Sequence, residues 1–87
     1  MFTVTQAASA RLADKLAKKS AGDEAAIRFV RRPGGWKLRV DKPADGDLRF
    51  AHEGRTVLVL TTDAANLLVD RTLDTDETPA GSKLRLR

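Results

Sequence analysis

The segment Ile27–Asp41, IRFVRRPGGWKLRVD, alternates apolar and charged side chains on both sides of a central Pro-Gly-Gly. Pro33 fixes its own φ, and Gly34 and Gly35 adopt positive φ at little steric cost, so the three residues favour a turn. Two runs of period two around such a turn are typical of a β-hairpin. We therefore predict a hairpin with one apolar face and one strongly cationic face.

An amphipathic helix is predicted before the hairpin, from Gln6 to Ser20. This segment is rich in Ala, Leu and Lys, and its apolar residues fall at helical spacing on one face. Thr5 is the expected N-cap because its hydroxyl can accept a hydrogen bond from a free amide of the first turn. Residues 21–23 are expected to end the helix, with Gly22 as a left-handed cap.

A second helix is predicted from Asp63 to about Arg71, capped by Thr61 or Thr62. Its expected apolar contacts are Ala64, Leu67, Leu68 and Leu73.

The remaining segments read as short strands. Arg55–Leu60 is apolar at four successive positions, which predicts a central strand buried on both faces. Further strands are expected at Phe2–Val4, Leu48–Ala51 and Ser82–Arg87, and residues 73–78 are expected to be extended or irregular. Strands between two helices, with no repeat and no linker, predict a single α+β domain over residues 1–87 that is mostly antiparallel.

Composition excludes several chemistries. The 87 residues contain no cysteine, which removes disulfides, thiolate nucleophiles and cysteine metal ligands, and His52 is the one histidine. The N-terminus lacks the pattern of a signal peptide, and the longest strongly apolar run, Val57–Leu60, is too short to span a bilayer. We therefore expect a cytoplasmic protein without membrane association. The net charge of +4 permits contact with a polyanion but does not require it.

Five segments, taken in order along the chain, match the sequence pattern of one known protein family. They are Val4–Leu12, Ile27–Val30, Asp47–Phe50, Gly54–Val59 and Gly81–Leu84. Together with the helix near residues 65–73, they resemble the HesB/IscA family of A-type iron–sulfur carriers. The resemblance implies a compact, mixed β-sandwich or pseudo-barrel flanked by two α-helices.

The same resemblance implies cluster or iron binding through three cysteines, one in the hairpin turn and two in a Cys-Gly-Cys near the C-terminus. Here Gly34, Gly35 and Trp36 occupy the turn, and no Cys-Gly-Cys occurs up to Arg87. Iron–sulfur clusters prefer thiolate ligands. We therefore expect no cofactor, no metal site and no enzymatic activity, and a binding or scaffold domain in place of a carrier.

The candidate binding surface is the hairpin itself. Its expected residues are Arg28, Arg31, Arg32, Gly34, Gly35, Trp36, Lys37 and Arg39. We expect a protein partner or a small anion here, with the partner and the oligomeric state left open. The alternative is a nucleic-acid-binding module that uses the arginine-rich residues 28–39, with arginines on phosphates and an aromatic ring on a base. Alternation places Trp36 with Leu38 and Val40, which predicts that the indole lies mostly in the core or at the mouth of the sandwich. The same alternation predicts that Arg28 and Arg31 face opposite ways.

Two other groups of residues are candidate sites. The acidic residues Asp70, Asp74, Asp76 and Glu77 could hold a hard cation, but they lack the spacing of a calcium loop. His52 with Glu53 or Asp47 could act as an acid–base pair. No nucleophile is signalled nearby, so the favoured interpretation is an exposed turn.

Overall fold

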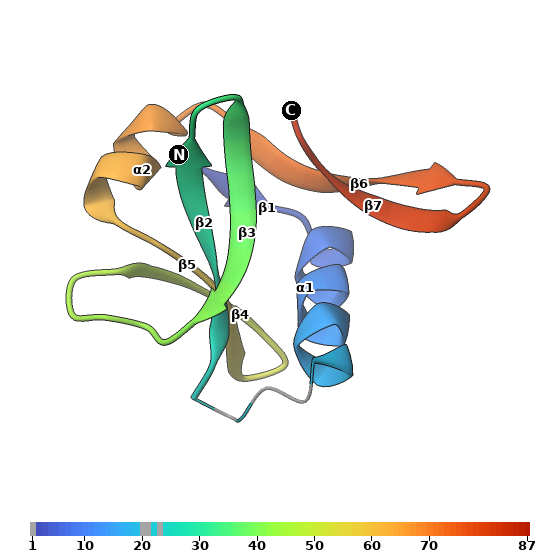
Figure 1. Ribbon diagram of the computed structural model, residues 1–87, viewed down its shortest axis with the longest axis horizontal. Coiled ribbons are helices and arrows are strands. Elements are labelled where there is room, and N and C mark those ends of the chain that lie inside the picture. Colours follow the sequence, from blue (N-terminus) through green and yellow to red (C-terminus); the bar gives the residue numbers. More distant parts are fainter. Residues whose placement is uncertain (1, 20–21, 23) are drawn as a thin grey trace.

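The computed structural model describes residues 2–19, 22 and 24–87 (Figure 1). This part of the chain forms seven strands and two helices. The strands are β1 (Thr3–Val4), β2 (Ala26–Arg32), β3 (Gly35–Asp41), β4 (Leu48–His52), β5 (Arg55–Leu60), β6 (Thr72–Thr78) and β7 (Gly81–Leu86), and the helices are α1 (Gln6–Lys18) and α2 (Thr62–Leu67). No helix within the described ranges is long and apolar enough to cross a membrane.

The predicted hairpin is confirmed as β2 and β3, which pair antiparallel along their full length. Gly34 has φ 92° and Gly35 has φ 130°, conformations that only glycine adopts readily. Phe29 lies opposite Leu38, and both pack in or against the apolar core. The apolar side of the hairpin therefore faces inward, as the period-two pattern predicts.

Strand β5 lies inside a four-stranded sheet of order β3-β2-β5-β4. Its residues Val57, Leu58, Val59 and Leu60 are completely buried, which confirms the predicted central strand. β5 runs parallel to β2 and antiparallel to β4. The second sheet, of order β1-β6-β7, is also mixed, with β1 parallel to β6 and β6 antiparallel to β7. The expected α+β class with mixed, mostly antiparallel sheets is confirmed.

Helix α1 packs against strands of both sheets, and Figure 1 shows it below the β6–β7 hairpin. Thr5 caps it as predicted, because its Oγ1 accepts a hydrogen bond from the Ala8 amide at 3.1 Å. The predicted C-terminus was wrong. Helix α1 ends at Lys18 with Lys19 as the C-cap, at φ −86°, so Gly22 does not cap it. Ser20, Ala21 and Asp23 of the predicted terminus lie outside the described residues.

Helix α2 is shorter than predicted. It begins after the N-cap Thr61 and ends at Leu67 rather than near Arg71. Ala64 and Leu68 are buried, but the Leu67 side chain is not part of the core, since Leu67 is 56% exposed. The chain turns after Leu68, and Thr72 then pairs with Thr3, so that β6 lies beside β1. This early turn leaves Leu67 and Arg71 on the surface.

Strand β6 confirms that the acidic residues 73–78 are extended, and it lies between β1 and β7. Its outward carboxylates meet arginines of β7. Asp76 contacts both Arg85 and Arg87 at 2.7 Å, and Asp74 contacts Arg87 at 3.4 Å. Leu84 and Leu86, on the other face of β7, pack against the core.

Candidate functional site

The tip of the β2–β3 hairpin lies beside α2, as the upper part of Figure 1 shows. Between them lies an open hollow of about 600 Å³. We call its lining the tip surface; it consists of Arg31, Arg32, Pro33, Gly34, Gly35, Trp36, Leu67 and Arg71. Two regions distant in sequence thus build one concave surface, with the hairpin turn on one side and the end of α2 on the other.

Trp36 forms the apolar part of this surface. Its ring centroid lies 5.0 Å from that of Phe29, at an interplanar angle of 35°, so the indole is anchored on the core. The residue is half-buried and packs against the core without being part of it, so the predicted position mostly in the core is confirmed only in part. Leu67 extends the apolar area toward solvent. A smaller hollow of about 210 Å³ behind Trp36 reaches Ala64 and Asp63 of α2.

The cationic part consists of Arg31, Arg32 and Arg71, all exposed. Within the described residues, none of the three forms an ion pair with a carboxylate side chain. Arg71 donates from Nε to the main-chain oxygen of Arg87 at 2.8 Å. The tip surface therefore presents uncompensated positive charge next to an apolar ring and a leucine.

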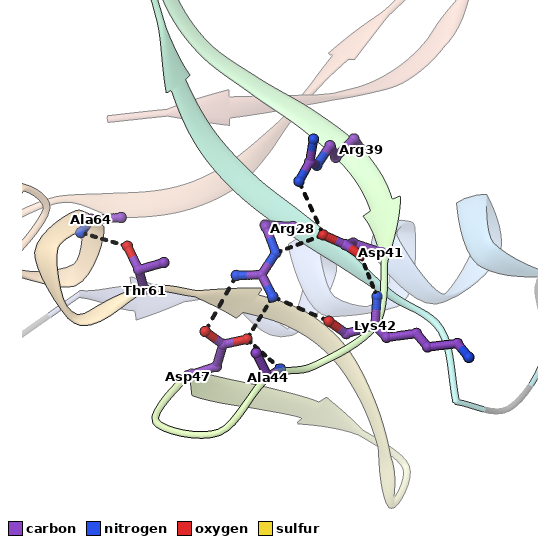
Figure 2. A network of polar contacts seen from close by, with 8 residues as sticks. All are labelled: Arg28, Arg39, Asp41, Lys42, Ala44, Asp47, Thr61 and Ala64. Carbon is purple, nitrogen blue, oxygen red and sulfur yellow. Dashed lines mark hydrogen bonds and ion pairs between the residues drawn. The ribbon is translucent and has the colours of Figure 1, made fainter.

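Arg28 does not share this surface, although it was predicted with it. Alternation along β2 turns Arg28 away from Phe29, onto a sheet face that the loop after β3 covers (Figure 2). Its side chain is 10% exposed. The guanidinium donates to Asp47 at 2.6 and 3.3 Å, to Asp41 at 3.0 Å and to the Lys42 carbonyl at 3.1 Å. These bonds satisfy its charge, so Arg28 fixes the loop and is not free to bind a partner.

The two carboxylates of this network are held in the charged form. The hydrogen bond from Arg28 lowers the pKa of Asp47, aided by the Ala44 amide at 2.7 Å. The Lys42 amide at 2.8 Å lowers the pKa of Asp41, followed by the hydrogen bond from Arg28. Asp47 in turn raises the pKa of Arg28. The network is a structural clamp between the sheet and the 42–47 loop.

The other predicted hairpin cations lie apart from the tip surface. Lys37 and Arg39 are exposed and share the sheet face of Arg28, opposite the face of Trp36. Arg39 contacts Asp41 at 3.1 Å. Of the eight predicted residues, five line the tip surface: Arg31, Arg32, Gly34, Gly35 and Trp36. The hairpin cations thus lie on two faces and do not form one continuous surface.

Leu67 and Arg71 are tip-surface residues that the sequence did not indicate. Leu67 has helical spacing relative to Ala64, so the pattern assigns it to the core. The signal that α2 is short comes from the pairing of β6 with β1, which no local pattern reveals.

The acid–base interpretation of His52 has no geometric support among the described residues. Asp47 precedes the first residue of β4, whereas His52 is the last residue of that strand. The Asp47 carboxylate also accepts hydrogen bonds from Arg28. Glu53 lies in the following turn with φ 52°, and no hydrogen bond joins it to His52. The acidic segment is similarly engaged, because Asp74 and Asp76 bind arginines of β7. In the described ranges, no three His, Asp or Glu side chains gather in a metal-binding group.

Two mixed sheets with two helices in this order form the fold of the HesB/IscA family, so the predicted resemblance is confirmed at the level of the fold. The chain superposes on the crystal structure of Escherichia coli SufA, a protein involved in the biosynthesis of iron–sulfur clusters, with a TM-score of 0.78 and 22% identity. This match covers 99% of the chain and 83% of SufA.

A second similar structure is that of IscA with a [2Fe-2S] cluster, with a TM-score of 0.61 and 24% identity over 100% of the chain and 81% of IscA. No protein-family model and no curated protein matches the sequence.

The residues present do not fit an iron–sulfur cluster. Cluster irons are held by cysteine thiolates, and the 87 residues contain none. The hairpin turn, where the resemblance would place a thiolate, consists of Pro33, Gly34 and Gly35 followed by the anchored Trp36. This chain therefore shares the architecture of SufA and IscA without a thiolate donor.

Proposed function

We propose that the chain is a non-enzymatic protein-binding module built on the SufA/IscA fold, and that its partner docks on the tip surface. The observation that carries the proposal is the combination of Arg31, Arg32 and Arg71, which pair with no carboxylate side chain in the described part of the chain, around the apolar Trp36 and Leu67. Arg and Trp are the residues most often found where interfaces derive their binding energy. A rigid aromatic ring next to exposed guanidinium groups suits a protein partner.

The partner chemistry follows from the lining. Carboxylates of the partner would pair with the three arginines, and an apolar side chain would fill the hollow beside Trp36 and Leu67. Nucleic acid is the weaker alternative, because it requires several cations along one face and an accessible aromatic ring. Arg28 is neutralised, Lys37 and Arg39 face away, and one side of the Trp36 ring packs on Phe29.

Capture from an extract of the native host, with the tagged chain as bait, tests the proposal. We expect a partner that binds the wild type and a Lys83→Glu control, but is lost from Arg31→Glu and from Leu67→Glu. Lys83 is exposed on β7, far from the tip in sequence and outside its lining. Equal capture by all four proteins would exclude the tip surface as the docking site.

Fluorescence anisotropy with single-stranded RNA and DNA of about 20 nucleotides tests the alternative. The proposal predicts no measurable binding near physiological salt. Binding whose log K falls linearly with log salt, and which Arg31→Glu abolishes, would support the nucleic-acid module instead.

Reconstitution with iron and sulfide under anaerobic conditions tests the absence of a carrier function. Without a thiolate, we expect no stable visible-range absorption after desalting. A stable cluster spectrum at stoichiometric iron loading would contradict a purely protein-binding role.

A further inference from the structure

Strand β3 forms one edge of the four-stranded sheet and pairs only with β2 among the described strands. An edge strand leaves alternate backbone N–H and C=O groups without a partner. β3 is seven residues long, whereas the opposite edge, β4, has five residues and a register shift after Phe50. β3 is thus the longer and more regular of the two edges of this sheet.

The apolar face of β3 remains partly uncovered beside this edge. Leu38 packs against the core, but Val40, two residues on along the same face, is 39% exposed. An open hollow of about 610 Å³ lies here, lined by Lys19, Leu38, Arg39 and Val40. A narrower extension of about 80 Å³ reaches Ile27 and Lys15. If another strand paired with this edge, every second side chain of that strand would pack against this apolar face.

Positive charge surrounds this edge. Lys19, the C-cap of α1, borders the hollow, and Lys15 borders its narrower extension. Lys37 and Arg39 project from the other face of β3. Within the described residues, the three lysines form no ion pair, and Arg39 contacts only Asp41 while 54% exposed. On the other long edge, β7, two of the three cations are paired, because Asp76 contacts both Arg85 and Arg87. The three lysines, which form no ion pair among the described residues, complement an acidic partner.

We infer that β3 is a strand-addition site for an extended segment of a partner protein in which acidic residues alternate with apolar ones. The apolar side chains would enter the hollow over Leu38 and Val40, and the acidic side chains would lie beside Lys37 and Arg39. This site is independent of the tip surface, which has a different lining. A second copy of the chain is a poor occupant, because antiparallel pairing of two β3 strands would bring Lys37 and Arg39 against each other.

The test uses the full chain labelled with ¹⁵N and the acetylated, amidated peptide Glu-Val-Glu-Ile-Glu-Val-Glu as probe. We expect slowed amide hydrogen exchange at alternate residues of β3, and an affinity that weakens as salt is raised. Two control peptides match the probe. One carries N-methyl groups at alternate positions and cannot pair as a strand, and the other replaces every Glu by Lys.

Variants of the chain locate the effect. Val40→Glu should weaken probe binding at least about tenfold, whereas Val69→Glu, at a valine of similar exposure outside the hollow, should leave it unchanged. If Val40→Glu loses its native spectrum, Arg39→Glu serves, with the same loss expected. Absence of protection in β3, equal binding of the Lys peptide, or β3 protection that appears on concentrating the chain without peptide would each overturn the inference.

Discussion

Arg28 and Arg31 are three residues apart on β2, yet they have opposite surroundings. Arg28 is 10% exposed on its side chain and is held by two carboxylates and a carbonyl. Arg31 is exposed at the tip surface, with no carboxylate partner in the described part of the chain. The difference separates two uses of one residue type: the enclosed arginine maintains the fold, and the open one is available to a partner. Sequence proximity alone does not distinguish them.

The largest effect is expected from removing the enclosed arginine. Arg28→Met leaves Asp47, whose side chain is 5% exposed, charged and without its main partner. We expect the free energy of unfolding to fall by about 3 kcal/mol, measured by urea denaturation at pH 7. Arg31→Met on the same strand is the matched control and should change it by no more than about 0.5 kcal/mol. Equal losses in the two variants would remove the distinction between the two arginines.

A smaller effect is expected at the turn that shapes the tip surface. Gly34→Val places a β-branched side chain at φ 92°, and the strain should cost about 1–3 kcal/mol. Thermal denaturation against Lys37→Ala, an exposed change in the same hairpin, measures it. Indistinguishable melting temperatures would show that the turn adopts another conformation.

Lowering the pH should reduce the stabilisation that the Arg28–Asp47 ion pair contributes. Since Arg28 lowers the pKa of Asp47 in the folded state, the stabilisation is complete above the ordinary carboxyl pKa. It is lost as pH falls through the lower folded-state value. The stability difference between wild type and Asp47→Asn should therefore shrink in urea titrations from pH 7 to pH 2. A difference that stays constant over this range would contradict the assignment.

The smallest effect is expected from the open arginines themselves. Arg31, Arg32 and Arg71 line one hollow and pair with no carboxylate side chain among residues 2–19, 22 and 24–87, so they repel each other at low salt. Arg32→Ala should raise the free energy of unfolding by no more than about 0.5 kcal/mol at low salt. The gain should vanish in about 0.5 M NaCl, because salt screens the repulsion. A loss above about 1 kcal/mol would reveal a carboxylate that neutralises the tip.

The sequence predicts what local patterns determine. Period-two alternation identifies β2 and β3, the continuous apolar run identifies β5, and threonines before apolar helices identify both N-caps. Alternation also indicates that Arg28 and Arg31 face opposite ways. It does not indicate that the 42–47 loop folds over the face of Arg28, because that depends on a bond between residues 28 and 47. The inclusion of Leu67 and Arg71 in the tip surface depends similarly on the pairing of β1 with β6.

The two hydrogen bonds of Thr5 bear on the order in which the chain folds. Its hydroxyl both accepts from the Ala8 amide and donates to Asp74 at 2.9 Å, a separation of 69 residues. β1 likewise finds its parallel partner only in residues 72 and 73. During synthesis, the first helix emerges from the ribosome long before the strand that secures its beginning. Closure of the two ends is therefore a late event with high contact order, and it should limit the folding rate.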